Sequence, residues 1–377
     1  MAVKPQVREQ NPSRIFRLLR TGEELTRQEI AAKLLLSMPT TLQNVTELVE
    51  TGLLEECGAI ESTGGRRAKK VRLCRQAGLA VGIDVALRHV ELVVTDLLGN
   101  VLHSKQVPLA FQNKADWYQQ LSGALADFLR ESGITESKVL GAGVSFPGII
   151  DAQSGRIVRS HILNLEDVSL ARFQKSIPFP AVFANDANCA CYAEKANGHD
   201  SFVYVSLNST VGGAIMLEQN LWLGDTCQAG EIGHMLLIPG GRPCYCGKAG
   251  CADAYLSSDV LAGPDRTLAE FFEGLRAGGP AEQAVWDSYL EHLAVLLTNL
   301  RMLTNMDMVI GGSVGAFIAP YLDDLCAQAA KYDRFARDVD YIFSCAQREH
   351  ACAAGAAALA LEQFAGRVLE RAERTEQ

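Results

Sequence analysis

The sequence contains no apolar run long enough to cross a lipid bilayer, which takes about 20 consecutive apolar residues in a helix. Its first ten residues, MAVKPQVREQ, lack the apolar core of a secretory signal peptide. Low-complexity segments and short repeats are also missing. We therefore expect a cytoplasmic protein that has no membrane partner.

Cysteine, by contrast, is abundant, and three of the 11 cysteines fall within eight residues. The pattern is His234-x9-Cys244-x-Cys246-x4-Cys251, with glycines on both sides of it. Such clustering in a chain without an export signal favours metal ligation over disulfide bonds. One imidazole and three thiolates form the ligand set of a closed, structural zinc site, Zn2+ being the expected cofactor. The alternative is a set of free buried cysteines beside a core histidine.

The length and the charge distribution indicate more than one domain. A chain of 377 residues is too long for one ordinary hydrophobic core, so two or three domains are expected. Residues 1–75 carry 13 Lys/Arg against 9 Asp/Glu, a net charge of +4, while the remainder carries 22 against 35, a net charge of −13. A basic N-terminal segment on an acidic body suggests that only this segment approaches a polyanion.

The basic segment has the pattern of three short helices followed by a hairpin. Residues 11–20 predict the first helix, and Thr26 begins the second at the spacing of a capping box. Ser37 is the expected N-cap of the third helix, which Gly52 ends. We expect the inner face of this third helix to consist of Leu42, Val45, Leu48 and Val49. Two strands, 53–56 and 71–73, then enclose a basic, glycine-rich tip.

This order matches a winged helix-turn-helix, in which the third helix enters the major groove of DNA. We expect contacts to base edges or phosphates from the start of that helix and from the tip of the wing. The candidates are Ser37, Pro39, Thr40, Thr41, Gln43 and Asn44 in the helix and Arg66 and Arg67 in the wing. A helical protein-interaction domain with a solvated charged hairpin is the alternative.

From residue 80 the pattern changes to alternating strands and helices, which indicates α/β architecture. The strands are expected at 81–85, 89–99, 101–107, 139–151, at the start of 181–198, in 201–217 and in 308–315. The helices are expected at 114–132, at the end of 181–198, at 281–304 and, rich in alanine, at 349–372.

Several motifs of this second part resemble those of the ROK family (repressors, open reading frames and kinases). The most specific is GEIGH (230–234) followed by CYCGKAGC (244–251). SFPGIID (145–151), NDAN (185–188) and IGGSV (310–314) match further family motifs in the same order. With the N-terminal helices, the resemblance covers essentially the whole chain and is greatest to the regulators, which include xylose-type and N-acetylglucosamine-type repressors.

The resemblance implies a fold and a domain division. Residues 1–75 would form the winged helix-turn-helix, and residues 80–377 a two-lobed ROK domain of the actin/hexokinase-like, ribonuclease-H-like kind. The zinc site would lie at 234–251, and the C-terminal helix 349–372 would pack back on the first lobe.

The resemblance also implies a sugar in the cleft between the lobes. Asp186 matches the catalytic base of the kinases, and a carboxylate there can accept a hydrogen bond from a sugar hydroxyl. The other sugar contacts that the resemblance implies are Gly155, Arg156, Asn164, Asn185, Glu231, His234 and Asp253, the last standing where relatives carry glutamate. Apart from the resemblance, Asp186 reads as a helix N-cap and Glu231 and Arg156 as surface residues.

One motif departs from the kinases of the family. Their first phosphate loop is Asp-x-Gly-Gly-Thr, whereas this chain has DVALRH (84–89). Glycines let backbone N–H groups approach a phosphate, and here side chains occupy that space. The second loop, STVGG (209–213), remains compatible with phosphate binding.

We therefore expect a sugar-responsive transcriptional repressor that has no kinase activity. A homodimer, or a tetramer, would bind operator DNA, and a sugar or sugar phosphate would change its DNA affinity. An ATP-dependent sugar kinase with Asp186 as the base is the alternative, and a scaffold whose N-terminal domain binds a protein is a third reading.

Overall fold

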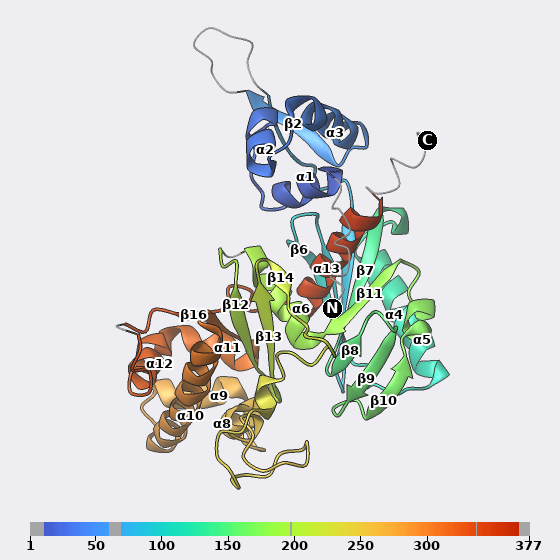
Figure 1. Ribbon diagram of the computed structural model, residues 1–377. Coiled ribbons are helices and arrows are strands. Elements are labelled where there is room, and N and C mark those ends of the chain that lie inside the picture. Colours follow the sequence, from blue (N-terminus) through green and yellow to red (C-terminus); the bar gives the residue numbers. More distant parts are fainter. Residues whose placement is uncertain (1–10, 60–68, 197, 337, 369–377) are drawn as a thin grey trace.

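The protein is described by a computed structural model that covers residues 11–59, 69–196, 198–336 and 338–368. Figure 1 shows a small N-terminal domain, here called the head, above two larger α/β lobes. The expected wing tip, with Arg66 and Arg67, lies outside the described residues. The expected fold class is confirmed: a helix-turn-helix domain precedes a two-lobed mixed helix and sheet body.

The head consists of three helices and a three-stranded sheet of order β1-β3-β2. The elements are α1 (Asn11–Leu19), β1 (Leu25–Thr26), α2 (Arg27–Leu34), α3 (Met38–Glu50), β2 (Leu54–Ala59) and β3 (Lys69–Leu73). Strand β1 was not expected, because two residues carry no detectable pattern; it pairs with β3 through Leu25↔Val71.

The helix starts in the head follow their caps. The Thr26 hydroxyl accepts a hydrogen bond from the Glu29 N–H, and the Glu29 carboxylate accepts one from the Thr26 N–H at 2.7 Å, which completes the capping box. The Ser37 hydroxyl accepts a hydrogen bond from the Thr40 N–H at 3.2 Å. Gly52 follows α3 with φ +76°, a conformation that costs other residues more. Both expected caps are confirmed.

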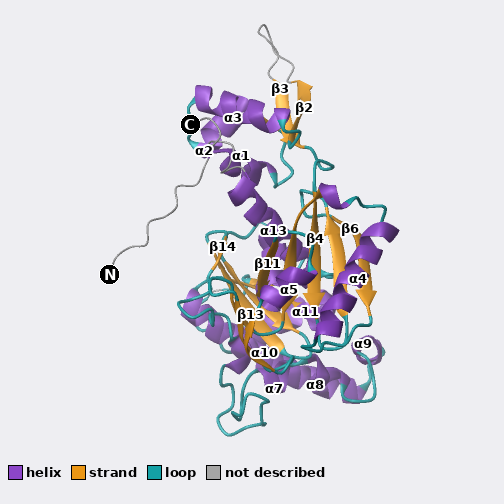
Figure 2. Ribbon diagram, turned by 90° about the vertical axis from the view of Figure 1, so that its right-hand side faces the viewer, coloured by secondary structure: helices purple, strands orange, loops and turns teal. Residues whose placement is uncertain are grey.

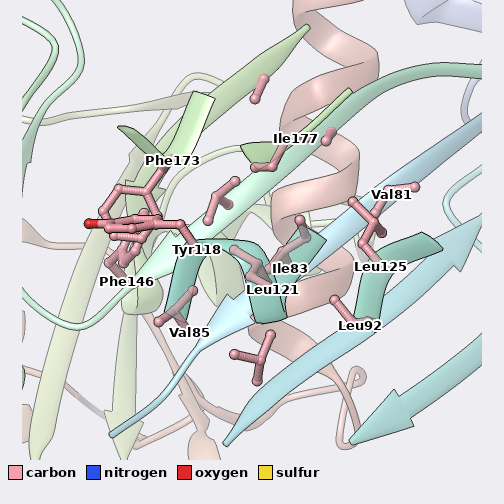
Figure 3. Close-up of a cluster of buried hydrophobic side chains, with 14 of the residues drawn as sticks. Val81, Ile83, Val85, Leu92, Tyr118, Leu121, Leu125, Phe146, Phe173 and Ile177 are labelled. Atoms are coloured by element: carbon pink, nitrogen blue, oxygen red, sulfur yellow. The ribbon is translucent and has the colours of Figure 1, made fainter. Parts of the chain in front are cut away.

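Lobe I is a five-stranded sheet of order β11-β7-β4-β5-β6 with a small sheet β10-β9-β8 beside it. Its strands are β4 (Leu79–Val85), β5 (Val90–Thr95), β6 (Val101–Val107), β7 (Val139–Phe146), β8 (Ile149–Asp151), β9 (Arg156–Ser160), β10 (Leu165–Ser169) and β11 (Ala181–Asn185). Helices α4 (Ala115–Glu131) and α5 (Ala171–Ser176) cover one face. Figure 3 shows the core between these helices and the sheet. There the ring centroid of Phe173 lies 4.6 Å from that of Phe146 and 5.0 Å from that of Tyr118.

Lobe II repeats the plan with a sheet of order β14-β13-β12-β15-β16. Its strands are β12 (Phe202–Leu207), β13 (Val211–Leu217), β14 (Asn220–Leu221), β15 (Asp307–Gly311) and β16 (Ile342–Ser344). Its helices are α7 (Asp253–Leu256), α8 (Ser258–Ala262), α9 (Leu268–Arg276), α10 (Pro280–Thr304), α11 (Gly312–Ile318) and α12 (Leu322–Ala329). Buried aromatic residues of α9 and α10, among them Phe272 and Trp286, fill its core.

Two helices connect the head and the two lobes. Helix α6 (Asp186–Ala193) runs from the end of β11 toward lobe II, and the long helix α13 (Ala351–Val368) packs against α6, β4 and β7. Glycine makes this approach possible: a Cβ on Gly82 would lie 1.9 Å from the Ala353 carbonyl oxygen, and one on Gly143 would lie 1.8 Å from that of Ala356. On α13 itself, a Cβ on Gly355 would lie 1.7 Å from the Cys189 carbonyl oxygen of α6.

The head rests on the far end of α13 (Figure 2). Ile15 and Phe16 of α1 share a buried cluster with Ala357 and Leu361 of α13. The Ser13 hydroxyl donates a hydrogen bond to the Ala365 carbonyl at 2.7 Å, so polar and apolar contacts fix the same two helices together. Among the helices in the described ranges, none combines the length and apolarity that a membrane span requires.

We predict that Gly355→Ala destabilises the protein, because the new methyl group would meet the α6 backbone, which cannot yield as a flexible side chain can. The free energy of unfolding should fall by about 1–3 kcal/mol, the usual cost of overpacking. Gly366→Ala on the same helix is the control, since nothing lies within 4 Å of its added Cβ. The control should be neutral or stabilising by up to about 1 kcal/mol. Urea unfolding followed by circular dichroism compares them, and equal midpoints would refute the close-packing argument.

Candidate functional site

A polar cavity of about 270 Å³ lies between the two lobes, close to the lower end of the range for small-ligand sites, about 300–1,000 Å³. We call it the cleft. Lobe I supplies Pro147, Gly148, Ile149, Arg159, His161 and Ile162; the β11–α6 junction supplies Asn185, Asp186 and Ala187; lobe II supplies Ser206, Asn208, Thr210, Val211, Gly212, Gly213, Gln228, Gly230, Glu231, His234 and Tyr245.

The junction of β11 and α6 brings Asn185 and Asp186 into the cleft. Strand β11 is parallel to β7, so its carboxyl end lies at the edge of the sheet where α/β proteins bind ligands. Asn185 is the N-cap of α6, since its Oδ1 accepts from the Asn188 N–H at 3.1 Å, while its Nδ2 donates to the Gly148 carbonyl. Asp186 is therefore not the cap that the sequence alone suggested. It is the first helical residue, and its Oδ1 accepts from the adjacent Ala187 N–H at 2.9 Å.

Three carboxylates crowd this region. Burial raises the pKa of Asp186 to about 6. Burial raises the pKa of Asp84, at the end of β4, to about 7, although the Ser145 hydroxyl donates to it at 2.6 Å and opposes the rise. The pKa of Glu231 is raised by loss of solvent and then by the negative charge of Asp186. A neutral ligand rich in hydroxyl groups can bind here without adding charge of the same sign.

The loop residues expected at the cleft lie elsewhere. Arg156 forms an ion pair with Asp167 of the neighbouring strand. Gly155 and Asn164 are turn residues with φ of +67° and +50°, and none of the three lines the cavity. Arg159 and His161, from the same hairpin, line it instead. The expected residues and the lining residues belong to the same hairpin, and in a two-residue alternation only the fold decides which side chains face inward.

Asp253 also differs from the expectation. Its side chain is buried, and Oδ1 accepts a hydrogen bond from the Val211 N–H at 2.6 Å. Burial raises its pKa. The carboxylate thus fixes the start of β13 and does not line the cavity, so its effect on a ligand would be indirect, through Gly212 and Gly213.

Sequence reasoning also missed several lining residues, of which Tyr245 is the most informative. Its hydroxyl lies 3.4 Å from Nε2 of His234, and its ring packs edge-on against the rings of His234 and His161. Tyr245 stands inside the cysteine motif, a signal that could have identified it. Asn208 and Gln228 lie just before the STVGG and GEIGH motifs, so the motifs themselves did not include them.

The cysteine cluster forms beside the cleft. The ligand atoms of His234, Cys244, Cys246 and Cys251 all lie within 4.8 Å of one another. Nδ1 of His234 is 3.8 Å from Sγ of Cys244, and the Sγ atoms of Cys246 and Cys251 are 3.7 Å apart. Zinc–sulfur bonds of about 2.3 Å in a tetrahedron separate two sulfurs by about 3.8 Å. The four side chains therefore have the spacing that a tetrahedral ion requires, and the metal would leave Nε2 of His234 free.

The expected first phosphate loop is a closed turn between β4 and β5. The Ala86 N–H donates to the His89 carbonyl at 3.0 Å, and Leu87 and Arg88 are exposed. In the second loop, STVGG, the Val211 N–H donates to Asp253. In the IGGSV motif (310–314), the Ser313 N–H donates to Asn208 at 2.7 Å. At each of these three turns, one backbone N–H is thus engaged within the protein.

The predicted recognition helix α3 is exposed along only part of its predicted face. Ser37, Pro39 and Gln43 are exposed and Thr40 is half-exposed. Thr41 and Asn44 are buried, because the Thr41 hydroxyl donates to the Ser37 carbonyl and Asn44 donates to the Thr40 carbonyl.

The inner face of α3 therefore begins one residue earlier than expected. Leu42, expected inside, is 45% exposed, and with Met38 it joins the outward surface. Thr41 and Asn44 are not available to DNA in this conformation.

Both parts of the chain match known protein families. Residues 80–363 match the model of the ROK family, and residues 11–57 match a helix-turn-helix domain. The chain is 25% identical over 346 residues to a putative xylose repressor of Caldicellulosiruptor, covering 85% of this chain and 87% of that protein. It is 24% identical over 260 residues to the regulator NagC of Escherichia coli, covering 68% and 64% of the two chains.

Solved structures show the same fold. A ROK family transcriptional regulator, described as a homologue of E. coli MLC protein, superposes with a TM-score of 0.80 at 19% identity and covers 96% of this chain and 98% of its own. A ROK hexokinase of Thermus thermophilus superposes with a TM-score of 0.61 at 24% identity, covering 78% of this chain and 99% of its own. Since the family model spans both lobes, the cleft and the cysteine cluster, this chain belongs to the ROK family.

Proposed function

We propose that this protein is a sugar-responsive, DNA-binding transcriptional repressor of carbohydrate-utilisation genes. The observation that carries the proposal is the direct packing of α13 on both α6, which begins at the cleft, and α1, in the head. A helix-turn-helix joined in this way to a hydroxyl-binding cleft can respond to its occupancy. The relatives named xylose repressor and N-acetylglucosamine repressor support this proposal.

The DNA interface would be the outward face of α3. Ser37, Pro39, Thr40 and Gln43 stand at its N-terminal end, where a recognition helix meets base edges, and Gln43 suits adenine. Two heads of a homodimer, or of a larger assembly, would contact the two halves of a palindromic operator. Arg66 and Arg67 remain candidates for phosphate or minor-groove contacts, and a DNA target would place the protein in the cytoplasm.

The sugar would lie between Asp186 and Glu231, with Asn185 and the free nitrogen of His234 beside them. Carboxylates accept hydrogen bonds from hydroxyl groups, and Oδ1 of Asn185, which accepts from the Asn188 N–H, has a second lone pair. Arg159, His161 and Tyr245 complete the wall in place of the residues predicted from the hairpin. The sugar would shift DNA affinity through its different affinities for two lobe arrangements.

The cysteine cluster would hold a structural Zn2+. Four protein ligands leave no position for water, so the ion would stabilise the segment from His234 to Cys251. This segment places His234 and Tyr245 in the cleft, so the metal would support sugar binding indirectly.

We predict that the Asp186→Asn variant loses sugar affinity by about tenfold or more, since a hydrogen bond to a charged group is worth about 1.5–3 kcal/mol. Thermal shifts with D-xylose, D-glucose, N-acetylglucosamine and their phosphates identify the ligand, and titration then measures affinity. Because the pKa of Asp186 lies at about 6, wild-type affinity should fall as the pH drops below that value and the carboxylate is protonated. Asp265→Asn, exposed and outside the cleft, is the control and should bind normally.

The same ligand should change the affinity for DNA selected by the full-length protein from a random duplex pool. Binding should weaken steeply with salt, as phosphate contacts require. Asp186→Asn should keep DNA binding but lose the response to sugar. A protein that selects no DNA, or whose DNA affinity ignores the sugar, would refute the proposed repressor.

We predict one zinc ion per chain in purified protein, measured by elemental analysis. Cys246→Ser should reduce the zinc content and the thermal stability, because three ligands and a hydroxyl bind the ion more weakly. Cys74→Ser, outside the cluster, should leave both unchanged. Full zinc occupancy in the Cys246 variant would contradict the assigned ligand set.

We predict no ATP-dependent phosphorylation of the sugars in the panel, because phosphoryl transfer depends on positioning and one backbone N–H of each phosphate turn is engaged within the protein. A coupled assay for ADP release provides the measurement. The one feature that favours the kinase alternative is Asp186 itself, positioned at the cleft with a raised pKa. Turnover that disappears in Asp186→Asn would establish that alternative.

A further inference from the structure

A second cavity, of about 350 Å³, lies where the head meets both lobes. We call it the junction cavity. The head contributes α1 and the two residues after it, lobe I contributes the turn between β5 and β6, and lobe II contributes the turns at Gln219 and Gln347. Residues of α6 and α13 and Lys195, which follows α6, form the remaining wall. No residue of the cleft lines this cavity.

Three cations and one carboxylate face the junction cavity. Arg17 comes from α1, Arg20 directly follows it, Lys195 follows α6, and Glu362 comes from α13. Arg17 pairs with Oε1 of Glu362, while Nη1 of Arg20 lies 3.4 Å from Oε2. The Tyr192 hydroxyl also donates to Oε2, at 3.0 Å. Each carboxylate oxygen of Glu362 thus interacts with a guanidinium group of the head, and Oε2 also accepts from the phenol.

Part of this donor capacity is unused. Nε of Arg20 is buried and has no acceptor among the described residues. Nζ of Lys195 lies 3.5 Å from the Tyr192 hydroxyl and 5.0 Å from the centre of its ring, a weak set of partners for an ammonium group. Burial and the two arginines lower the pKa of Lys195 despite Glu362. An anion in the cavity would satisfy these donors and relieve the repulsion among the cations.

We propose that the junction cavity binds a small metabolite that carries a phosphate group. The oxygens of a phosphate group suit both the buried Nε of Arg20 and the ammonium group of Lys195, and its negative charge would offset the repulsion between these two cations. Ala354, Ala358 and Leu98 give the remainder of the metabolite an apolar surface, and Asn100 and Gln347 offer polar groups to its hydroxyls. The proposal goes beyond the sugar cleft and holds whether or not the cleft binds a sugar.

The position of this site gives it a regulatory consequence. Its ligand would contact α1 of the head and the end of α6, the helix that starts at Asp186. A ligand that joins these elements favours the head arrangement in which they are close, so it changes DNA affinity, and DNA changes its affinity by the same factor.

Calorimetric titration of the full-length protein with inorganic phosphate, D-glucose 6-phosphate and D-glucose, at constant ionic strength, tests the proposal. Saturable binding of a phosphate probe should weaken about tenfold in Lys195→Gln, because a charged donor is lost. Arg20→Lys should also weaken it, since lysine keeps a charge toward Glu362 but lacks the buried Nε. Lys175→Gln removes an exposed charge of α5 outside the cavity and should bind as the wild type does. Glucose 6-phosphate binding more tightly than inorganic phosphate identifies a metabolite site rather than a site for the free ion.

The Asp186→Asn variant distinguishes phosphate binding in the cleft from phosphate binding in the junction cavity. If phosphate binding disappears in that variant and persists in Lys195→Gln, the phosphate binds in the cleft and the proposal is wrong. Absence of saturable binding by both phosphate probes at millimolar concentration also overturns it. Thermal unfolding of each variant, compared with the wild type, shows whether weaker binding reflects a lost contact or a lost fold. As a second readout, the bound probe should change DNA affinity in the wild type and not in Lys195→Gln.

Discussion

The contact on which the rest of the structure depends is the backbone approach of α13 to lobe I and to α6. Where α13 meets β4, β7 and α6, the backbones lie so close together that there is no room for a side chain at Gly82, Gly143 or Gly355. Helices in such contact cannot slide independently, because an interior packed to this density has few alternative arrangements. The same helix carries the head on its C-terminal half. A movement of α6 would therefore reach the head through α13.

The two cavities at the ends of α6 differ in the charge of the residues that line them. At its N-terminus the cleft holds Asp186 and Glu231, with Asp84 behind them, so a neutral polyhydroxyl ligand binds there without repulsion. At its C-terminus the junction cavity holds two arginines and Lys195 against a single carboxylate. The two cavities are suited to ligands of opposite electrostatic character, which lets one helix respond to two chemical signals. Both signals would act on the position of α1 relative to α13.

The errors of sequence reasoning in this chain share a cause. In α3, Thr41 and Asn44 are expected to contact DNA because they lie near the start of the helix, yet both are buried with their polar groups bonded to the preceding turn. In the 156–164 hairpin, Arg156 pairs with Asp167 while Arg159 faces the cleft. Asp253 bonds a backbone N–H in place of a ligand. In each case residue type allowed two environments, and a partner distant in the sequence or in the preceding turn selected one.

The sequence by itself determined the features whose physical cause is local. The capping box at Thr26, the cap at Ser37, the alternation of strands and helices and the spacing of Cys244, Cys246 and Cys251 all depend on residues within a few positions of one another. Only the tertiary structure decided which side chains share a cavity. The gathering of Arg17, Arg20, Lys195 and Glu362 joins positions up to 345 residues apart, and no local pattern records such a distance. Hydrogen bonds along the chain fix elements, whereas burial and charge act between elements once the fold has brought them together.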